Sequence, residues 1–234
     1  MLSQTFFIYS VYNGEIVDRL HTYFSRGVFL IFTFANLSCS ESKAQELSFI
    51  PDFSLWDKET LIQARNASFK KSNPDTSGAV IFYCNLARMN GPLFVQAILR
   101  PYMEFMGKTD YEPYLQSLVV DLNSLKKLHP LQRCEVLDSM AKSYAKWSGR
   151  HWIIGHVKFI ERFGVLIEDG KLVGENCSYG ISSAIGVVMQ LLVDEGVRSL
   201  GHRENILDPA FNKIGVGFAP HGRYKTNCVL EFSD

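Results

Sequence analysis

The segment "GHRENILDPAFNKIGVGF", residues 201–218, places His202, Arg203 and Glu204 directly between a glycine and an apolar core pattern. Three interpretations of these polar residues compete: a helix start with ordinary surface charges, a metal-binding or catalytic histidine, and the rim of a pocket for an outside ligand. The residues that follow alternate between apolar and small side chains, which predicts a strand. The rest of the sequence is needed to choose among these three interpretations.

The composition predicts one main globular domain. Of the 234 residues, 47% are hydrophobic and 21% are charged, which is enough apolar material for a sizeable core and too much for a disordered chain. Lys plus Arg equals Asp plus Glu at 24 each, so nothing favours a nucleic-acid partner or an anionic membrane surface. The five cysteines show no CxxC spacing, which argues against a zinc knuckle and a dense disulfide framework.

An apolar run near the N-terminus indicates export. The run "GVFLIFTFANL", residues 27–37, is too short to span a bilayer and has the length of a signal-peptide core. A small residue, Cys39 and a polar stretch follow it, as at a lipoprotein cleavage site. We expect residues 1–40 to be a signal or lipoprotein leader with Cys39 as the candidate for lipidation; plain secretion and a buried core strand are the alternatives. The protein is then extracytoplasmic, secreted or lipid-anchored at the cell surface or in the periplasm.

Helical and strand patterns follow the leader. Residues 41–77 are predicted as a linker with a short helix near "KETLIQARNASFKK", ended by the turn residues "NPDTSG". Helical spacing of apolar residues recurs in "AVIFYCNLARMN", "GPLFVQAILRPYMEFMG", "YLQSLVVDLNSLKKL", "EVLDSMAKSYAKWSG" and "SSAIGVVMQLLVDEGV". Residues 149–180 are rich in glycine and are expected to be loop and short strands, and "KIGVGFAPHGRYKTNCVLEFS" predicts a hairpin. Helices around a small C-terminal sheet make an α+β sandwich over residues 78–234.

Residues capable of proton or metal chemistry lie beside glycines in the C-terminal half. The common motifs G-x-S-x-G, GKS or GKT, G-x-G-x-x-G after a strand and H-E-x-x-H are absent. The candidates are instead His156, Glu175, Asp194, Glu195 and His202. A neighbouring glycine lets the backbone turn sharply and aim such a side chain inward. Helical geometry leaves both Asp194 and Glu195 able to reach a cleft, and His129, His151 and His221 are expected at the surface or in loops.

Convergence of these side chains would place two imidazoles and one or two carboxylates in one cleft. Neutral imidazole nitrogens could then bind Zn²⁺ or another divalent cation, with carboxylates orienting the rings. The same histidines could equally activate a water as a general base. A single His or Glu beside a glycine is more often a turn or capping residue, so the functional interpretation depends on convergence.

Two cysteines lie in expected strands. Cys177 follows the glycine-rich segment and Cys228 lies in the last strand. A disulfide between them in an oxidising compartment and a pair of buried free thiols are equally good alternatives.

Together these segments resemble the CAP superfamily, which comprises cysteine-rich secretory proteins, insect venom antigen 5, plant pathogenesis-related proteins and bacterial SCP-like members. The resemblance covers about residues 80–233 and is carried by "NLARMNGPLF", "GH...ERFG......GEN" and "GHRENILDPAFNKIGVGF". It implies a three-layer α-β-α sandwich with a small antiparallel sheet. It also implies a cleft formed by His156, Glu175, His202 and one of Asp194 or Glu195. The family's second acid usually follows a tryptophan-containing motif, whereas this chain has "MQLLVDE".

The resemblance implies an extracellular protein, since family members are mostly extracellular and some bind divalent metal, sterols or fatty acids. We therefore expect a non-catalytic binding module whose cleft binds a divalent cation at His156 and His202. The alternatives are a metal- or His-dependent hydrolase that uses the same cleft, and lipid or sterol binding. No Ser or Cys lies in an evident nucleophile context, which argues against covalent catalysis. The expected partner is a small ligand, a lipid or a cell-surface molecule, with the membrane reached only through a lipid anchor.

Overall fold

The computed structural model covers the C-terminal four fifths of the chain almost continuously. The described residues are 9–12, 15–18, 49–70, 74–108 and 112–234. The apolar run at residues 27–37 and Cys39 lie outside them, whereas residues 9–12 and 15–18 of the expected leader are described as strands. The leader and the lipidation site stay predictions. Within the described part, no helix has both the length and the apolar character needed to cross a membrane.

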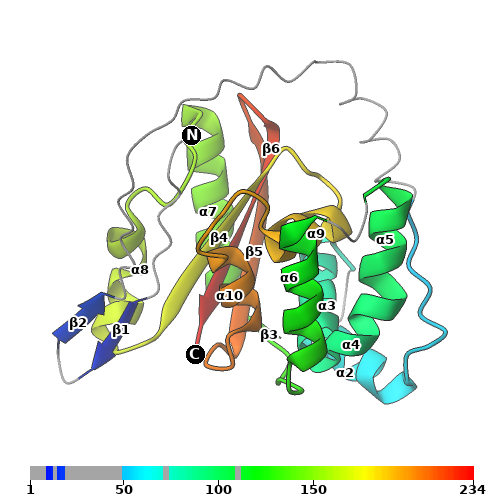
Figure 1. The fold of residues 1–234 in the computed structure, drawn as a ribbon. Helices are drawn as coiled ribbons and strands as arrows, with labels where there is room; N and C mark the ends of the chain where they lie inside the picture. The colour runs from blue at the N-terminus through cyan, green and yellow to red at the C-terminus, as the bar shows by residue number, and fades with distance from the viewer. Residues whose placement is uncertain (1–8, 13–14, 19–48, 71–73, 109–111) are drawn as a thin grey trace.

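A six-stranded sheet in the order β2-β1-β4-β6-β5-β3 runs through the molecule (Figure 1). Its strands are β1 (Tyr9–Tyr12), β2 (Glu15–Asp18), β3 (Gln132–Arg133), β4 (Val173–Tyr179), β5 (Lys213–His221) and β6 (Lys225–Ser233). The predicted hairpin is confirmed as β5 and β6, and β4 pairs antiparallel with the other side of β6. The edge strand β3 pairs parallel with β5, so the expected antiparallel pairing holds except there.

Helices cover both faces of this sheet and make a three-layer α-β-α sandwich, as expected (Figure 1). The helices are α2 (Lys58–Ser68), α3 (Thr76–Met89), α4 (Gly91–Phe94), the π-helix η1 (Val95–Leu99), α5 (Arg100–Phe105), α6 (Pro113–Ser124), α7 (Glu135–His151), α8 (Phe159–Glu168), α9 (Ala184–Val193) and α10 (Gly201–Leu207). On one face α7 packs against β5 and β6, with α8 beside β4. On the other face α3, α9 and α10 contact the sheet, and α6 packs outside them.

Side-chain caps start several helices where turn residues occur in the sequence. A side-chain oxygen at an N-cap accepts a hydrogen bond from a backbone N–H that has no partner inside the helix. The N-caps of this kind are Asp57 in α2, Asp75 in α3, Asn90 in α4 and Ser183 in α9. The predicted break at "NPDTSG" is therefore also the start of α3, because it supplies Asp75.

Two glycines of β5 let α7 lie directly on the sheet. A Cβ at Gly217 would lie 2.2 Å from the backbone nitrogen of Lys142, and one at Gly215 would lie 2.0 Å from the carbonyl carbon of Leu137. Both distances are far below van der Waals contact, and both neighbours are backbone atoms that cannot rotate away. The G-x-G pattern of β5 thus serves the packing of α7 rather than a turn.

Helix α8 is the main element that the sequence did not predict. Residues 149–180 were expected to be loop and short strands, but Phe159–Glu168 is helical. Its buried residues Phe159, Phe163 and Ile167 follow a spacing of four and form one stripe against the sheet. Only three apolar positions define this stripe, so the surrounding glycines dominated the sequence pattern.

The segment before the CAP-like region contributes to the core. The helix expected near "KETLIQARNASFKK" is present as α2. Trp56 is only 5% exposed and Ala64 is fully buried, and both belong to the same hydrophobic cluster as α3 and α9. Part of the expected linker is therefore packed structure.

The contact between α7 and β5 predicts a strong effect of a single methyl group. We expect Gly217→Ala to lower the free energy of unfolding by about 1–3 kcal/mol, because the methyl group displaces the α7 backbone. Gly164→Ala is the matched control: no atom lies within 4 Å of its Cβ position, so removing a glycine from α8 should raise stability by up to about 1 kcal/mol. Urea denaturation of both variants tests this, and equal effects of the two substitutions would contradict it.

Candidate functional site

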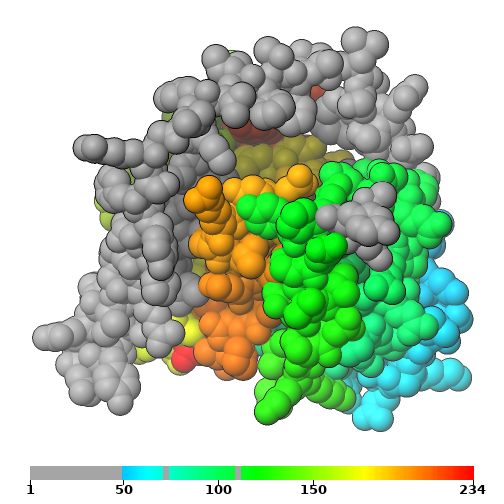
Figure 2. All heavy atoms as spheres, viewed as in Figure 1, coloured from blue at the N-terminus to red at the C-terminus, as the bar shows by residue number. Residues whose placement is uncertain are grey.

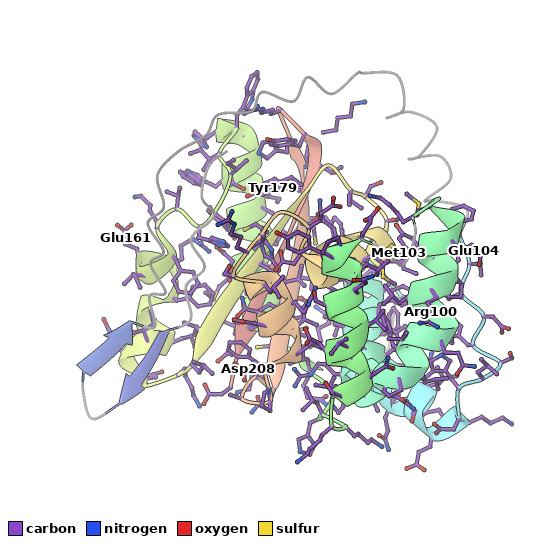
Figure 3. The ribbon with its side chains drawn as sticks, viewed as in Figure 1. Arg100, Met103, Glu104, Glu161, Tyr179 and Asp208 are labelled. Carbon is purple, nitrogen blue, oxygen red and sulfur yellow. The ribbon has the colours of Figure 1, made fainter. Side chains whose placement is uncertain are left out.

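His156 follows a turn that two tyrosines hold in place. Gly155 adopts a left-handed backbone with φ 83°, so the predicted use of a glycine beside the histidine is confirmed here. The Tyr144 hydroxyl donates to the Gly155 carbonyl at 2.5 Å and accepts from the Val157 N–H at 3.0 Å. The Tyr179 hydroxyl, at the end of β4 in Figure 3, accepts from the Gly155 N–H at 2.8 Å. These bonds fix the backbone on both sides of His156.

The imidazole of His156 is paired with a buried carboxylate. Its Nδ1 lies 2.8 Å from Glu175 Oε1, and the two side chains are 4% and 0% exposed. Arg162 of α8 donates to both oxygens of the same carboxylate, from Nη1 at 2.5 Å and from Nη2 at 2.8 Å. Burial opposes the charged form of Glu175, but the hydrogen bonds from His156 and Arg162 outweigh it and hold the pKa of Glu175 below its ordinary value.

A second carboxyl group shares the same guanidinium. Glu231 of β6 is the cross-strand partner of Glu175 and is fully buried, and its Oε1 accepts from Arg162 Nη1 at 3.0 Å. Burial raises the pKa of Glu231 well above its ordinary value, and the negative charge of Glu175 raises it further. One arginine therefore lies between a carboxylate and a carboxyl group that favours its neutral form.

His202 forms a second pair of the same kind. Its Nδ1 lies 2.6 Å from Asp194 Oδ1, while its backbone N–H donates to Asp194 Oδ2 at 2.9 Å. Asp194 is 2% exposed and ends α9 with a left-handed φ of 57°. Glu195, also expected in the cleft, is exposed instead and its Oε2 lies 3.7 Å from Lys108 Nζ. Of the two acids that the sequence left open, Asp194 is the one paired with a histidine, and Glu195 is not.

Both pairs fix the orientation and the tautomer of an imidazole. A carboxylate oxygen only accepts hydrogen bonds, so Nδ1 of His156 and of His202 donates to it. In the neutral ring the lone pair then lies on Nε2. Proteins use this arrangement to present an imidazole to a metal ion, and it is also the arrangement of a histidine that acts as a general base.

Buried asparagines join the elements that carry the two pairs. Asn176, next to Glu175 in β4, donates to the His202 carbonyl at 2.9 Å. Asn205 of α10 donates to Asn176 Oδ1 at 2.8 Å and to the Glu175 carbonyl at 3.3 Å. These bonds hold α10 against the backbone of β4. The Glu175 side chain precedes Asn176 in the strand and points to the opposite face, toward Arg162, so the convergence of the two imidazoles in one cleft stays a prediction.

Arg203 is a structural residue that is buried in α10. Its guanidinium donates to the carbonyls of Leu192 at 2.7 Å and Val193 at 3.0 Å, and to the Asp121 carboxylate at 2.8 Å. These bonds tie α10 to α9 and α6, and α6 and α10 lie side by side on the face shown in Figure 2. The left-handed residue before α10 is Leu200, with φ 53°, so the predicted turning role of the neighbouring glycine was wrong here.

Comparison with known proteins places the chain in a family. A sequence model of the cysteine-rich secretory protein family (CAP) matches residues 82–232, well over half of the chain. The chain belongs to the CAP family. Both histidines and both of their carboxylate partners lie inside the matched region, and proteins of this family are typically secreted.

Two solved structures are also similar to this CAP protein. An outer surface protein of Borrelia burgdorferi has 22% sequence identity over 52% of this chain and 88% of its own, with a TM-score of 0.39. A cysteine-rich secretory protein of Staphylococcus aureus has 19% identity over 51% of this chain and 38% of its own, with a TM-score of 0.35. No curated protein matches the chain.

The CAP site includes a group with the spacing of a metal site. Ligand atoms of His156, Glu175 and Cys177 all lie within 4.8 Å of one another. Two of the three fit a cation poorly. Both oxygens of Glu175 are bonded to the positively charged Arg162, and burial raises the pKa of the Cys177 thiol well above its ordinary value, with the charge of Glu175 adding to it. Within this group the imidazole is the best ligand, with Glu175 as its orienting partner.

The cysteines of the CAP domain that the structure describes are free thiols. Cys177 packs against Ala141 and Val229 under α7, whereas Cys228 belongs to the main core on the opposite face of the sheet. The disulfide considered for Cys177 and Cys228 is therefore not formed, and the alternative of two buried thiols holds.

The remaining histidines that the structure describes divide into two kinds. His129 and His151 are exposed, as expected. His221 was expected at the surface or in a loop, but it is 2% exposed. Its Nε2 lies 3.1 Å from the Ile153 carbonyl and its Nδ1 accepts from the Arg223 N–H, so it is a structural residue of the β5–β6 turn.

Arg162 and Glu231 are the site residues that the sequence analysis missed. Arg162 lies in the "ERFG" portion of the central signature, but nothing in the sequence links it to Glu175. Glu231 interrupts the apolar "CVLEF" strand, and a charged residue within such a strand is the available signal. Its partner could be identified only from the strand register.

The raised pKa of Glu231 predicts a pH-dependent stability. Stabilisation from a group with a raised folded-state pKa is complete below its unfolded value, near 4.5, and is lost as the pH rises through the folded value. Glu231→Gln removes this titration, so we expect wild type to lose stability relative to the variant progressively as the pH rises above about 4.5.

Urea denaturation at several pH values measures this difference. Glu195→Gln is the control, because an exposed carboxylate with a lysine 3.7 Å away should leave the pH profile unchanged. A difference between wild type and Glu231→Gln that is constant across pH would contradict the assignment.

Proposed function

We propose that this CAP protein is an exported binding module in which His156 and His202 bind a divalent cation such as Zn²⁺. The observation that carries the proposal is the hydrogen bond from each Nδ1 to a buried carboxylate. Such partners orient an imidazole ligand and raise its basicity, and their loss typically lowers metal affinity about 10–100-fold. Both residues that orient the histidines, Glu175 and Asp194, are themselves held by further hydrogen bonds.

The arrangement of charges also supports a cation site built from imidazoles. Glu175 is neutralised by Arg162, whereas Asp194 accepts from His202 and from the backbone N–H of Arg203, at 3.4 Å. Of these two carboxylates, Asp194 is therefore the one with no hydrogen bond to a guanidinium among the described contacts. A bound cation would supply positive charge, which attracts an anionic or carbonyl oxygen of a ligand into the cleft.

Export rests on the sequence and on the family. Proteins of the CAP family are typically secreted, and the apolar run at residues 27–37 followed by Cys39 is typical of a signal or lipoprotein leader. A lipid on Cys39 would anchor the module at the cell surface or in the periplasm.

Catalysis is a second candidate that the same observation favours. A histidine whose Nδ1 donates to a carboxylate is the form in which imidazole acts as a general base. A hydrolase that uses His156 or His202 to activate water needs no covalent nucleophile. Hydrolysis of peptide or ester substrates that is lost in His156→Ala and His202→Ala would favour this function over simple binding.

Calorimetric titration of Zn²⁺ into the metal-free protein tests the metal proposal. If both imidazoles bind one ion, His156→Ala and His202→Ala should each lower the affinity by at least about tenfold, and Asp194→Asn should lower it by about 10–100-fold. The exposed His129 provides the matched control, because His129→Ala should bind like wild type.

Two outcomes would contradict the proposal. Wild-type affinity in both single histidine variants would show that these imidazoles do not bind the ion. Loss of binding in Cys177→Ser combined with full binding in His202→Ala would instead assign the metal to the group of His156, Glu175 and Cys177.

A further inference from the structure

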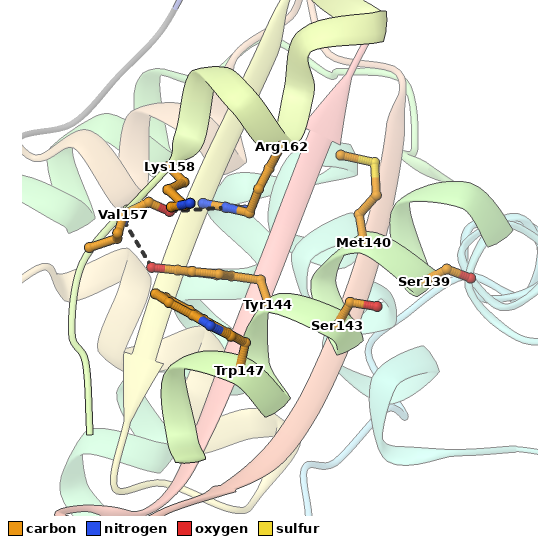
Figure 4. A pocket seen from close by; sticks show the side chains of 8 residues that line it. All are labelled: Ser139, Met140, Ser143, Tyr144, Trp147, Val157, Lys158 and Arg162. Carbon is orange, nitrogen blue, oxygen red and sulfur yellow. Dashed lines mark hydrogen bonds between the residues drawn. The ribbon is translucent and has the colours of Figure 1, made fainter. Parts of the chain in front are cut away.

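A pocket lies outside the histidine pairs, between α7 and the start of α8 (Figure 4). Its volume is about 460 Å³, within the range of about 300–1,000 Å³ that is common for small-molecule sites. One face of α7 supplies Met140, Ser143, Tyr144 and Trp147, and the other wall includes Lys158. Residues of α7 at spacings of three and four share one side of a helix, so these side chains line a continuous surface.

The walls of the pocket are mainly apolar and aromatic. The rings of Tyr144 and Trp147 are stacked, with centroids 5.9 Å apart and an angle of 23° between their planes. The Arg162 guanidinium lies over the Tyr144 ring at 3.6 Å. Tyr144 is also fixed through its hydroxyl, which bonds the backbone around His156. This wall is therefore rigid before any ligand arrives, which lowers the entropy cost of binding a planar molecule.

The charged side chains that line the pocket are those of Lys158 and Arg162, and both are cations. Arg162 already donates to Glu175 and Glu231, so its charge is largely compensated. Lys158 lies 3.3 Å from Glu161, but both of these side chains are more than half exposed. Glu161 points outward from α8 in Figure 3. An exposed ion pair of this kind is weak, so the ammonium group of Lys158 can turn to an anion in the pocket.

Lys158 occupies a position where local preferences favour another residue. It is the N-cap of α8, with a left-handed φ of 59°, and no side chain caps this helix. A left-handed backbone is uncommon for lysine, and a positive charge at a helix N-terminus opposes the helix dipole. An anion bound here would interact favourably with both the ammonium group and the N-terminus of α8.

We propose that this pocket binds a small amphiphilic anion, with a planar apolar body on the α7 wall and one acidic group at Lys158. The ligand would contact Tyr144, which holds the backbone around His156, and Arg162, which holds the carboxylate of Glu175. The pocket is thus a separate site from the proposed metal site, with two residues shared between them. Its ligand binding does not require a metal ion.

Two fluorescent probes that share one ring system test the proposal. The first, 8-anilinonaphthalene-1-sulfonate, carries an anionic group, and the second, N-phenyl-1-naphthylamine, is its uncharged counterpart. We expect wild type to bind the anionic probe with one-to-one stoichiometry and at least about fivefold more tightly than the uncharged probe, since a charge-assisted bond accounts for a difference of this size.

Variants of Lys158 test the position of the acidic group. Lys158→Gln should weaken binding of the anionic probe by about fivefold or more and leave the uncharged probe within about twofold. Lys158→Gly should have the same effect on binding without loss of thermal stability, because glycine accepts the left-handed backbone. Lys142→Gln is the matched control, since this lysine of α7 lines a different pocket.

Filling the pocket tests its location. Ser143→Phe places a ring among the lining side chains and should weaken binding of both probes by more than about tenfold. Ser143 is exposed, so the substitution does not disturb the core. Ser124→Phe, at an exposed position of α6 away from the pocket, should bind both probes like wild type.

Three results would overturn the proposal. Wild-type binding of the anionic probe to Ser143→Phe would place the probe elsewhere. If Lys158→Gln weakened the binding of both probes equally, or of neither, the acidic group of the ligand would not contact Lys158. A failure of Zn²⁺ binding affects only the proposed metal site and leaves these results unchanged.

Discussion

The buried hydrogen bonds that Asn176 and Asn205 make are the interaction on which the candidate site depends. They join β4 to α10, and these two elements carry Glu175 and His202. A helix of seven residues is too short to be stable on its own, so the position of α10 comes from its tertiary bonds. Buried amide groups cost free energy unless they are paired, and the pairing here permits one arrangement of the helix on the strand. The precise placement of an imidazole therefore follows from polar contacts in the core.

Arg162 plays the corresponding role for the other histidine. Its guanidinium joins α8 to β4 and β6 through Glu175 and Glu231, and both carboxyl groups are fully buried at their side chains. A buried carboxylate persists as a charge only where a cation and hydrogen-bond donors compensate its lost hydration. Because Arg162 provides this compensation, Glu175 stays ionised and can orient His156. The neutral form favoured by Glu231 avoids a second uncompensated charge in the same place.

Periodicity predicted the parts of the fold that have long apolar stripes. The helices α3, α7 and α9 and the hairpin of β5 and β6 follow directly from it, and the glycines beside His156, Glu175 and His202 made these residues the site candidates. The second acid could not be chosen in this way. Extrapolation at about 100° per residue assumes that the helix continues, but α9 ends at Val193 and Asp194 has a left-handed backbone. A change of backbone conformation at one residue thus turned Asp194 inward and Glu195 to solvent. The position of Glu231 depended on the strand register, and that of Arg162 on the packing of α8 against the sheet.

The position of Arg162 between the pocket and Glu175 has a further physical consequence. Its planar fork bonds the carboxylate on one side, while its flat face lies over Tyr144 on the side of the pocket. A ligand against this face would lower the freedom of the guanidinium and of Tyr144, and both groups hold the surroundings of His156. Coupling between two sites is reciprocal, so a cation held by the imidazoles would affect the pocket as much as a pocket ligand affects the imidazoles. Lys158 contacts neither Glu175 nor His156 among the described hydrogen bonds and ion pairs, which makes it the residue that separates binding in the pocket from events at the histidines.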